Sequence, residues 1–192
     1  MWSSEVTNMI IAGIGETLYM TLVSTIAGYI IGLPMGIVLT VSDKDGIRPN
    51  SFIYKILDVI VNIVRSIPFI ILLVLLIPFT RFLVGKSYGS TATIVPLVVA
   101  AAPYIARMVE SSLKEVDAGV IEAARSMGAS DFDIVTKVLL VEARTSLLVG
   151  ATISLGTILG YSAMSGAVGG GGLGAIAIRY GYTRWQTDIM IA

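Results

Sequence analysis

The 192-residue chain is poor in charge: 55% of its residues are hydrophobic and only 14% are charged, against about 25% charged residues in soluble domains. This composition predicts an all-α, polytopic integral membrane protein. Cys and His are both absent, which excludes disulfides, thiolate nucleophiles and imidazole acid–base chemistry, so we expect neither a metal site nor an enzymatic activity. The 13 basic residues balance the 13 acidic ones and are scattered, so no nucleic-acid partner is indicated.

The first apolar run extends from about Thr17 to Val41 without a charged residue, which is long enough for a membrane helix of roughly 20 residues. No Lys or Arg precedes Lys44. The run therefore lacks the basic region of a cleavable signal peptide, and we expect it to be retained. Gly28, Gly32 and Gly36 follow one another at four-residue spacing, which allows a second helix to approach closely. The spacing leaves open whether that helix belongs to the same subunit or to another.

A polar turn from Ser42 to Lys55 precedes the second predicted span, from about Ile56 to Phe82. This span is interrupted at Arg65 and Pro68 and is expected to kink at Pro78. A charge at membrane depth usually faces a bundle interior or water. Arg65 is therefore a candidate pathway residue. The alternative is that it reaches the near interface, because it lies only about nine residues into the span.

A third span is predicted from about Thr91 to Ile105 and a fourth from about Thr145 to Val168. Ser162 and Ser165 in the fourth span are candidates for lining a transport pathway, and packing between helices is the alternative. Met164, which is flexible and polarizable, is a candidate hydrophobic gate, although a lone Met in a membrane helix also suits lipid or core. The last four residues, IMIA, begin another apolar run, so we expect about five spans, the last truncated in this chain.

Lys and Arg in the loops predict the orientation. Three basic residues precede the second span, two lie at its far side, and five lie between the third and fourth spans: Lys44, Arg48 and Lys55, then Arg81 and Lys86, then Arg107, Lys114, Arg125, Lys137 and Arg144. Because loops rich in basic residues stay in the cytoplasm, residues 106–144 should be cytoplasmic and the N-terminus outside.

The central polar segment, residues 106–144, predicts two short helices joined by a sharp turn. Asp117 suits the N-cap of a helix through Met127, and Gly128 suits its left-handed end. Ser130 resembles a second N-cap, with Asp133 three residues later as in a capping box. The second helix would run on towards the fourth span.

The first of these helices would expose a face of small residues, Ala123 and Ala124, between Glu122 and Arg125. Such a face is suited to another protein's groove, and a solvated loop without a partner is the alternative. The stretch Glu122-Ala123-Ala124, then three residues, Gly128, and nine residues to Val138-Leu139-Leu140-Val141, resembles the EAA motif of ABC-importer permeases. Val141 stands where that motif has proline.

The resemblance extends to RSIPFIILLV at 65–74 and to SAMSGAVGGGGLGAIAIRYGY at 162–182, which are similar to the permeases of methionine importers. It implies one ABC type I transmembrane domain over residues 1–192, with residues 106–144 as its cytoplasmic coupling segment, in a bacterial plasma (inner) membrane. The transported substrate would be methionine, the D isomer included, and the mechanism alternating access.

The same resemblance implies that this subunit binds no cofactor of its own. Two copies would form a homodimer surrounded by membrane lipid. Two cytoplasmic ATPases, holding ATP and Mg²⁺, would bind the coupling helices, and an external binding protein or lipoprotein would deliver the substrate. The residues implied in ATPase coupling are Glu122, Ala123, Ala124, Arg125 and Gly128. No phosphate-binding loop is present, because Gly85-Lys86-Ser87 lacks the required glycine at position 80.

Three other functions remain as alternatives: a permease for another small polar solute, a transporter driven by an ion gradient, and a membrane scaffold. Ion-driven transporters usually place carboxylates within their spans. The predicted spans put Glu16 and Asp58 at span ends, which disfavours that class. Uptake assays separate a scaffold from a transporter.

Overall fold

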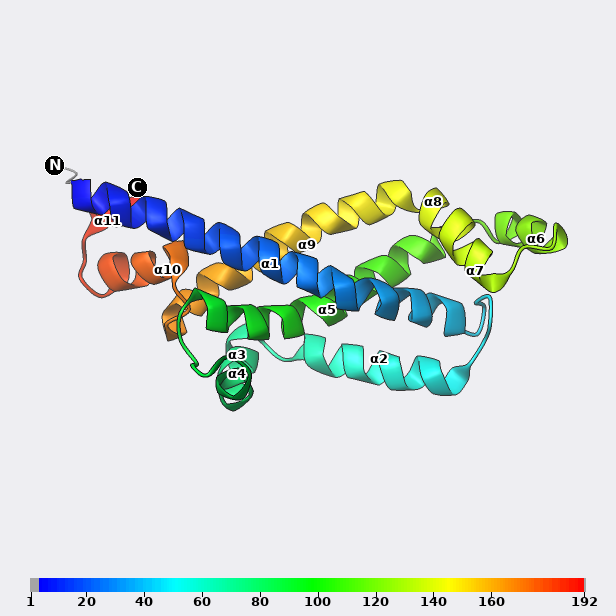
Figure 1. Ribbon diagram of the computed structural model, residues 1–192, viewed down its shortest axis with the longest axis horizontal. Helices are drawn as coiled ribbons and strands as arrows, with labels where there is room; N and C mark the ends of the chain where they lie inside the picture. Colours follow the sequence, from blue (N-terminus) through cyan, green and yellow to red (C-terminus); the bar gives the residue numbers. More distant parts are fainter. Residues whose placement is uncertain (1–3, 192) are drawn as a thin grey trace. The chain divides into compact units, whose positions relative to one another are not determined.

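The computed structural model of the protein describes residues 4–191, and every regular element in that range is a helix (Figure 1). The predicted all-α class is confirmed. In chain order the elements are α1 Ser4–Ser42, α2 Ser51–Ser66, α3 Phe69–Leu75, α4 Ile77–Val84, α5 Ser90–Lys114, α6 Ala118–Ser126, α7 Asp131–Asp133, the π-helix η1 Ile134–Leu139, α8 Leu140–Glu142, α9 Arg144–Ser165, the 3-10 helix η2 Gly166–Val168, α10 Gly172–Ile176, the π-helix η3 Ala177–Tyr182 and α11 Thr187–Ile191.

The helices form two compact units. Unit 1 comprises Met1–Ala27, Ile67–Ala100 and Leu155–Ala192, and unit 2 comprises Gly28–Ser66 and Ala101–Ser154. The helices α1, α5 and α9 each contribute to both units.

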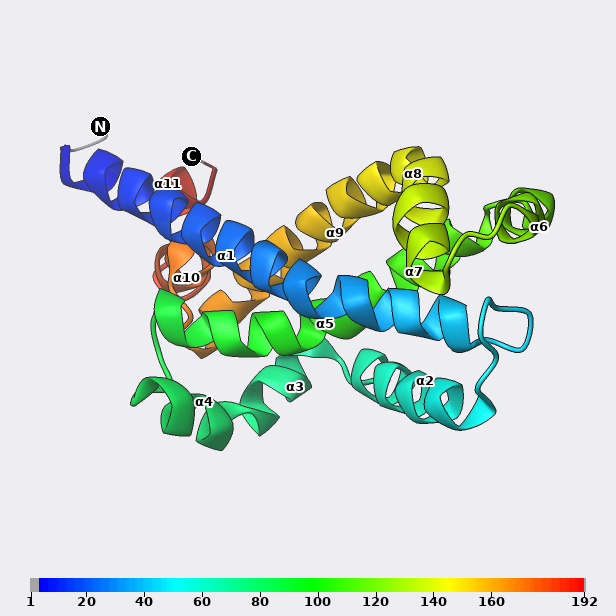
Figure 2. The same ribbon diagram turned by 45° about the vertical axis from the view of Figure 1, so that its right-hand side comes forward.

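Unit 2 is built around the C-terminal halves of α1 and α5 with α2 beside them, as Figures 1 and 2 both show. Its core contains Leu39, Val61 and Ala106, one from each of these helices, all fully buried. Burial of aliphatic side chains of this size stabilises a fold by roughly 1.5–3 kcal/mol each in water. In lipid, close packing takes over that role.

The glycines of α1 form the contact between α1 and α5 in unit 2. A Cβ added at Gly28 would lie 2.9 Å from Ala101 Cβ, one at Gly32 would lie 2.6 Å from Ala102 O, and one at Gly36 would lie 2.6 Å from Ala106 O. No side chain fits at such distances from backbone atoms. The glycine ladder therefore packs within one subunit, and not between subunits.

Unit 1 is closed by the glycine-rich segment after α9. A Cβ at Gly166 would lie 2.2 Å from Gly174 C, so the chain folds back tightly on itself here. The carboxylate of Glu16 accepts a hydrogen bond from Gly172 N at 2.6 Å, and Thr17 Oγ1 accepts one from Leu173 N at 2.9 Å. Two side chains of α1 thus satisfy the free N–H groups at the start of α10.

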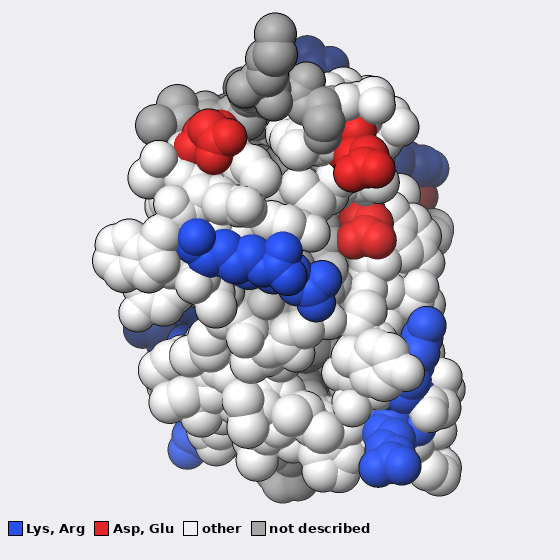
Figure 3. Space-filling model, turned by 90° about the vertical axis from the view of Figure 1, so that its left-hand side faces the viewer, with Lys and Arg blue, Asp and Glu red and all other residues white. Residues whose placement is uncertain are grey.

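Among residues 4–191, three helical segments are long and apolar enough to cross a membrane: Ser4–Ser42, Ser90–Lys114 and Arg144–Tyr182. A fourth span is obtained if α2 and α3, which are sharply bent at the break between them, count as one broken span. Figure 3 shows one end of the molecule, on which isolated charged side chains lie among mostly uncharged ones. The last helix, α11, is too short to span within the described residues.

The helices extend beyond the predicted spans. The helix that contains the first predicted span starts at Ser4, so Glu16 lies inside a helix rather than at its end. The helix that contains the third predicted span continues past Ile105 to Lys114, and Arg107, Glu110 and Lys114 in that extension form ion pairs. The final four residues fall mainly in α11, and Ala192 lies outside the described residues.

The interruption predicted at Pro68 in the second span is confirmed, whereas the kink predicted at Pro78 is not found. The chain leaves the helix at Ile67 and Pro68, because proline lacks an N–H and disfavours helical geometry in the residue before it. Pro78 does not kink a continuous helix. It lies in the first turn of α4, where a missing N–H costs nothing.

Candidate functional site

The predicted coupling helix is α6, nine residues long. Its N-cap is Asp117, as predicted, and the Asp117 carboxylate accepts a hydrogen bond from Gly119 N at 2.7 Å. At the other end Gly128 has φ +84°, the left-handed conformation that ends a helix, and nothing lies within 4 Å of a Cβ added there. Glycine is therefore favoured at position 128 by the left-handed backbone conformation, and not by a lack of space for a side chain.

The second cap is also as predicted. Ser130 Oγ accepts a hydrogen bond from Asp133 N at 3.2 Å and donates one to Asp133 Oδ2 at 2.5 Å. Lys137 Nζ lies 2.6 Å from Asp133 Oδ1. These donors, Lys137 foremost, lower the pKa of Asp133 to about 2. The ionised carboxylate thus fixes the turn between the two helices of the segment.

Beyond this turn the predicted single helix is interrupted. The chain passes through the π-helix η1 and the short α8, and it turns at Ala143 before α9 begins at Arg144. Val141, which stands where the EAA motif has proline, lies within α8 and is 48% exposed. The bend towards the fourth span therefore occurs two residues after Val141 and without proline.

One face of α6 is turned inwards, which corrects the predicted exposed surface. Ala124 is only 6% exposed, whereas Glu122, Ala123 and Arg125 are exposed. Ala124 is therefore a packing residue inside unit 2. Its neighbour Arg125 donates a hydrogen bond to Ile47 O at 2.7 Å and so ties α6 to the α1–α2 loop.

Two large apolar side chains were missed by the sequence analysis. Met127 is 82% exposed and Phe132 is 76% exposed, on the two sides of the Gly128 turn. Figures 1 and 2 show α6 beyond the ends of α1 and α5 in unit 2. Two exposed hydrophobic side chains at a projecting tip are typical of a surface that contacts another protein. Their proximity to the caps could have been read from the sequence.

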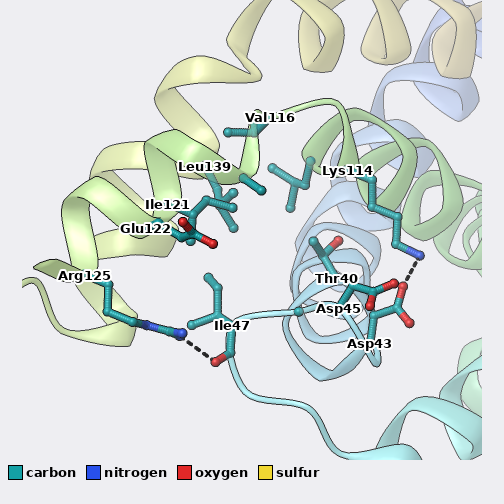
Figure 4. A pocket seen from close by; sticks show the side chains of 13 residues that line it. Thr40, Asp43, Asp45, Ile47, Lys114, Val116, Ile121, Glu122, Arg125 and Leu139 are labelled. Atoms are coloured by element: carbon teal, nitrogen blue, oxygen red, sulfur yellow. Dashed lines mark hydrogen bonds and ion pairs between the residues drawn. The ribbon is translucent and has the colours of Figure 1, made fainter.

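A pocket of about 430 Å³ separates α6 from the α1–α2 loop and the end of α5 (Figure 4). Lys114 and Asp43 both line the pocket and form an ion pair with each other at 2.5 Å. The hydrogen bond from Lys114 holds the pKa of Asp43 below its ordinary value. Glu122 also lines the pocket, and among residues 4–191 no ion pair involves it. The pocket therefore presents one uncompensated carboxylate.

A charge network below this pocket was also missed. Glu110 of α5 is 4% exposed and accepts hydrogen bonds from Arg107 at 2.6 Å and from Lys114 at 2.8 Å. Arg107 in turn pairs with Asp58 and donates to Asn62 Oδ1 at 3.0 Å. The spacing of Arg107, Glu110 and Lys114 on one helix face was a visible signal. The partners of these residues on α2 and in the α1–α2 loop could not be recognised from the sequence.

The serines proposed for the pathway are internal to unit 1. Ser162 is 1% exposed and donates to Leu159 O at 2.8 Å, and Ser165 is fully buried and donates to Ser162 O at 2.6 Å. A Cβ at Gly170 would lie 2.4 Å from Ser165 Oγ. Both hydroxyls are therefore satisfied by their own helix, which favours the packing alternative over a pathway role.

Met164 and Arg65 are placed differently from the serines. Met164 is 53% exposed on α9 in unit 1. Arg65 is exposed in the last turn of α2 in unit 2, and no ion pair or hydrogen bond of its side chain is found within residues 4–191. Both side chains are therefore free to meet molecules outside the described chain.

These features define a helical membrane subunit with a short, capped, projecting helix on one of its loops. The family model for inner membrane components of binding-protein-dependent transport systems matches residues 28–190. The chain belongs to that family, and it is therefore a transporter permease component and not an enzyme, as the sequence analysis predicted.

The relatives agree with this assignment. The chain is 44% identical over 189 residues to the probable D-methionine transport system permease protein MetI of Vibrio cholerae, covering 98% of this chain and 84% of that protein. It is 55% identical over 158 residues to the D-methionine transport system permease protein MetI of Escherichia coli, covering 82% and 73%. A solved inward-facing structure of the MetNI methionine ABC transporter matches with a TM-score of 0.97 at 53% identity, covering 99% of this chain and 88% of that chain. The resemblance to methionine-importer permeases is thereby confirmed.

Proposed function

We propose that the chain is the permease subunit of an ATP-driven importer that moves methionine, the D isomer included, across the bacterial inner membrane by alternating access. The proposal for methionine is supported by the names of the relatives and by the length over which they match. One observation of the structure supports coupling to an ATPase. It is the projecting α6, capped by Asp117 and ended by Gly128, with Met127 exposed beside it.

The partners of the subunit follow from its size and surface. Three or four spans are too few to enclose a polar pathway, so a second copy related by a two-fold axis is needed. A separate ATPase, holding ATP and Mg²⁺, binds α6 on the cytoplasmic side, and an extracytoplasmic binding protein delivers the substrate on the other. The N-terminus is outside and residues 106–144 are inside, in agreement with the basic residues of the loops. The subunit itself binds no cofactor.

Within the EAA stretch the residues have different roles. Glu122 and Ala123 contact the ATPase, with Glu122 forming a charge-assisted bond. Arg125 and Ala124 hold α6 to the rest of unit 2, and Gly128 sets the turn.

The gate of the pathway is Met164, which is exposed and apolar. Reconstituted Met164→Ala transporter should leak methionine without ATP, because the smaller side chain leaves a wetted opening. A leak equal to that of the wild type would exclude Met164 as the gate.

Co-purification of an ATPase tests the proposed function. Tagged wild-type protein is purified from its own membranes beside Gly128→Glu, and accompanying proteins are identified by mass spectrometry. The matched control is Gly89→Glu, because Gly89 has nearly the same φ, +86°, and equally open surroundings, but lies between α4 and α5.

We expect an ATPase with a phosphate-binding loop to accompany the wild type and Gly89→Glu, and to be lost from Gly128→Glu. Methionine uptake into proteoliposomes then tests the substrate. Intact protein that carries no ATPase in any of the three preparations would refute the proposal.

A further inference from the structure

The helix α2 has two different exposed faces. One is apolar, and its members are 45%, 47% and 58% exposed: Ile56, Ile60 and Ile63. The opposite face carries Asp58, Asn62 and Arg65, which recur at four- and three-residue spacing and so lie above one another. Lipid suits the first face. The second face requires protein, water or a polar ligand.

Arg65 lies deep in the membrane. Lys114, which pairs with the loop residue Asp43, is the last residue of α5, at the end that the proposed orientation places in the cytoplasm. Arg107 lies seven residues before Lys114 in α5. At 1.5 Å per residue, the two are about 10 Å apart along the helix axis. Arg107 bonds to Asn62 across the helix pair, and Arg65 is three residues beyond Asn62. The distance from Lys114 to Arg107 and the distance from Asn62 to Arg65 add up to a depth of about 15 Å for Arg65. This depth is half of a hydrocarbon core roughly 30 Å thick.

This depth removes the snorkelling alternative. The helix α2 begins at Ser51, so Arg65 is its fifteenth residue and not the ninth of a later span. The guanidinium is exposed, and nothing within residues 4–191 pairs with it. A cation at mid-depth is retained where it meets an anion or a water-filled pathway.

The end of α2 adds hydrogen-bond acceptors next to this cation. The helix stops at Ser66, because Pro68 follows two residues later. The Ser66 hydroxyl donates to Asn62 O at 2.7 Å. Outside the helices, no backbone N–H in the described range bonds to the carbonyls of Val64 or Arg65. These acceptors, at the negative end of a helix, attract an ammonium group.

We propose that Arg65 binds the α-carboxylate of the transported amino acid while the free carbonyls at the end of α2 accept hydrogen bonds from its α-ammonium. The proposal rests on the methionine import proposed above. A guanidinium matches a carboxylate with two parallel hydrogen bonds, and the two halves of the site lie within one helical turn, as do the two charges of a zwitterion. The site recognises the amino-acid backbone, so discrimination between side chains falls to the external binding protein.

Photo-cross-linking tests this site without the binding protein. The wild-type permease–ATPase complex in detergent is labelled with a diazirine analogue of methionine. Unlabelled methionine and methioninamide, which lacks the carboxylate, are the competitors. We expect methionine to compete at about 10- to 100-fold lower concentration, the range for a hydrogen-bonded charge. In Arg65→Gln the ratio should approach one, and in Arg65→Lys it should lie between. Arg81→Gln, which removes an exposed arginine of α4, is the control and should keep the wild-type ratio.

The outcomes separate the proposals. Equal competition by both compounds in the wild type would overturn the carboxylate site even if a variant fails to assemble. An unchanged ratio in Arg65→Gln would do the same and would leave Arg65 a merely structural residue. Methionine uptake by wild-type complex with its binding protein tests the import function on its own. If uptake occurs and the ratio is one, only the Arg65 proposal fails. If neither uptake nor labelling occurs, both fail.

Discussion

The contact between α1 and α5 predicts opposite outcomes for one substitution at two positions of the same helix. At Gly32 a Cβ would lie 2.6 Å from Ala102 O and 2.9 Å from Ile105 Cβ, so α1 and α5 must separate in Gly32→Ala. At Gly15 nothing lies within 4 Å, so Gly15→Ala displaces no atom. Gly15→Ala is therefore the matched control.

The magnitudes follow from two terms. Replacing a helical glycine by alanine stabilises by about 0.8–1 kcal/mol at either site, through helix propensity. Overpacking at Gly32 costs about 1–3 kcal/mol, because the nearest atom belongs to the backbone and cannot rotate away. The propensity terms cancel in the comparison, so the two variants should differ by the packing term alone. For a chain of this length that corresponds to roughly 2 to 12 °C in unfolding midpoint.

Thermal unfolding of both variants in one detergent, followed by the loss of the monodisperse size-exclusion peak, measures this difference. We expect Gly15→Ala to unfold at or above the wild-type midpoint and Gly32→Ala below it. Midpoints within a degree of each other would refute the conclusion that the glycine ladder packs within a subunit.

Three further outcomes are expected. Glu110→Gln removes one anionic partner of Arg107 and of Lys114 at a buried site, and it should lower the stability measured by thermal unfolding by about 2–4 kcal/mol. The control Asp45→Asn, which is exposed in the α1–α2 loop, should leave the stability nearly unchanged. Gly128→Ala forces an L-residue to φ +84° and should lower amide-exchange protection of α6 by roughly 1 kcal/mol, and unchanged protection would contradict the strain. Because the folded pKa of Asp133 is depressed to about 2 from 3.8, its stabilising effect is present above its ordinary pKa and is lost as pH falls through 2. Carboxyl NMR titration should show this midpoint, and Lys137→Met should raise it.

Local chemistry could be predicted from the sequence and long-range contacts could not. The caps at Asp117, Gly128 and Ser130 were predicted correctly, because each depends on residues within four positions. The burial of Ala124 and the Arg125 bond to Ile47 O, 78 positions away in sequence, were missed, because neither is decided by neighbouring residues. The partner of the glycine ladder was left open for the same reason.

Helices extend beyond the predicted spans where charged residues are satisfied inside the fold. The third span was predicted to end before Arg107 because charges normally leave the bilayer. In the structure Arg107 is paired with Asp58 and Glu110, and the helix continues. A hydropathy pattern contains no information on whether a charge has a partner.

The polar residues of the spans therefore fall into two groups with different meanings. Ser162 and Ser165 satisfy their hydroxyls on their own helix, and Glu110 neutralises two cations, so these residues need nothing outside the subunit. Arg65 at mid-depth and Glu122 at the projecting tip have no ion-pair partner in the described chain. Since an unpaired charge is costly in lipid and uncommon on a contact surface, these two positions mark where other molecules complete the transporter. We propose that a protein meets Glu122 and that the substrate meets Arg65.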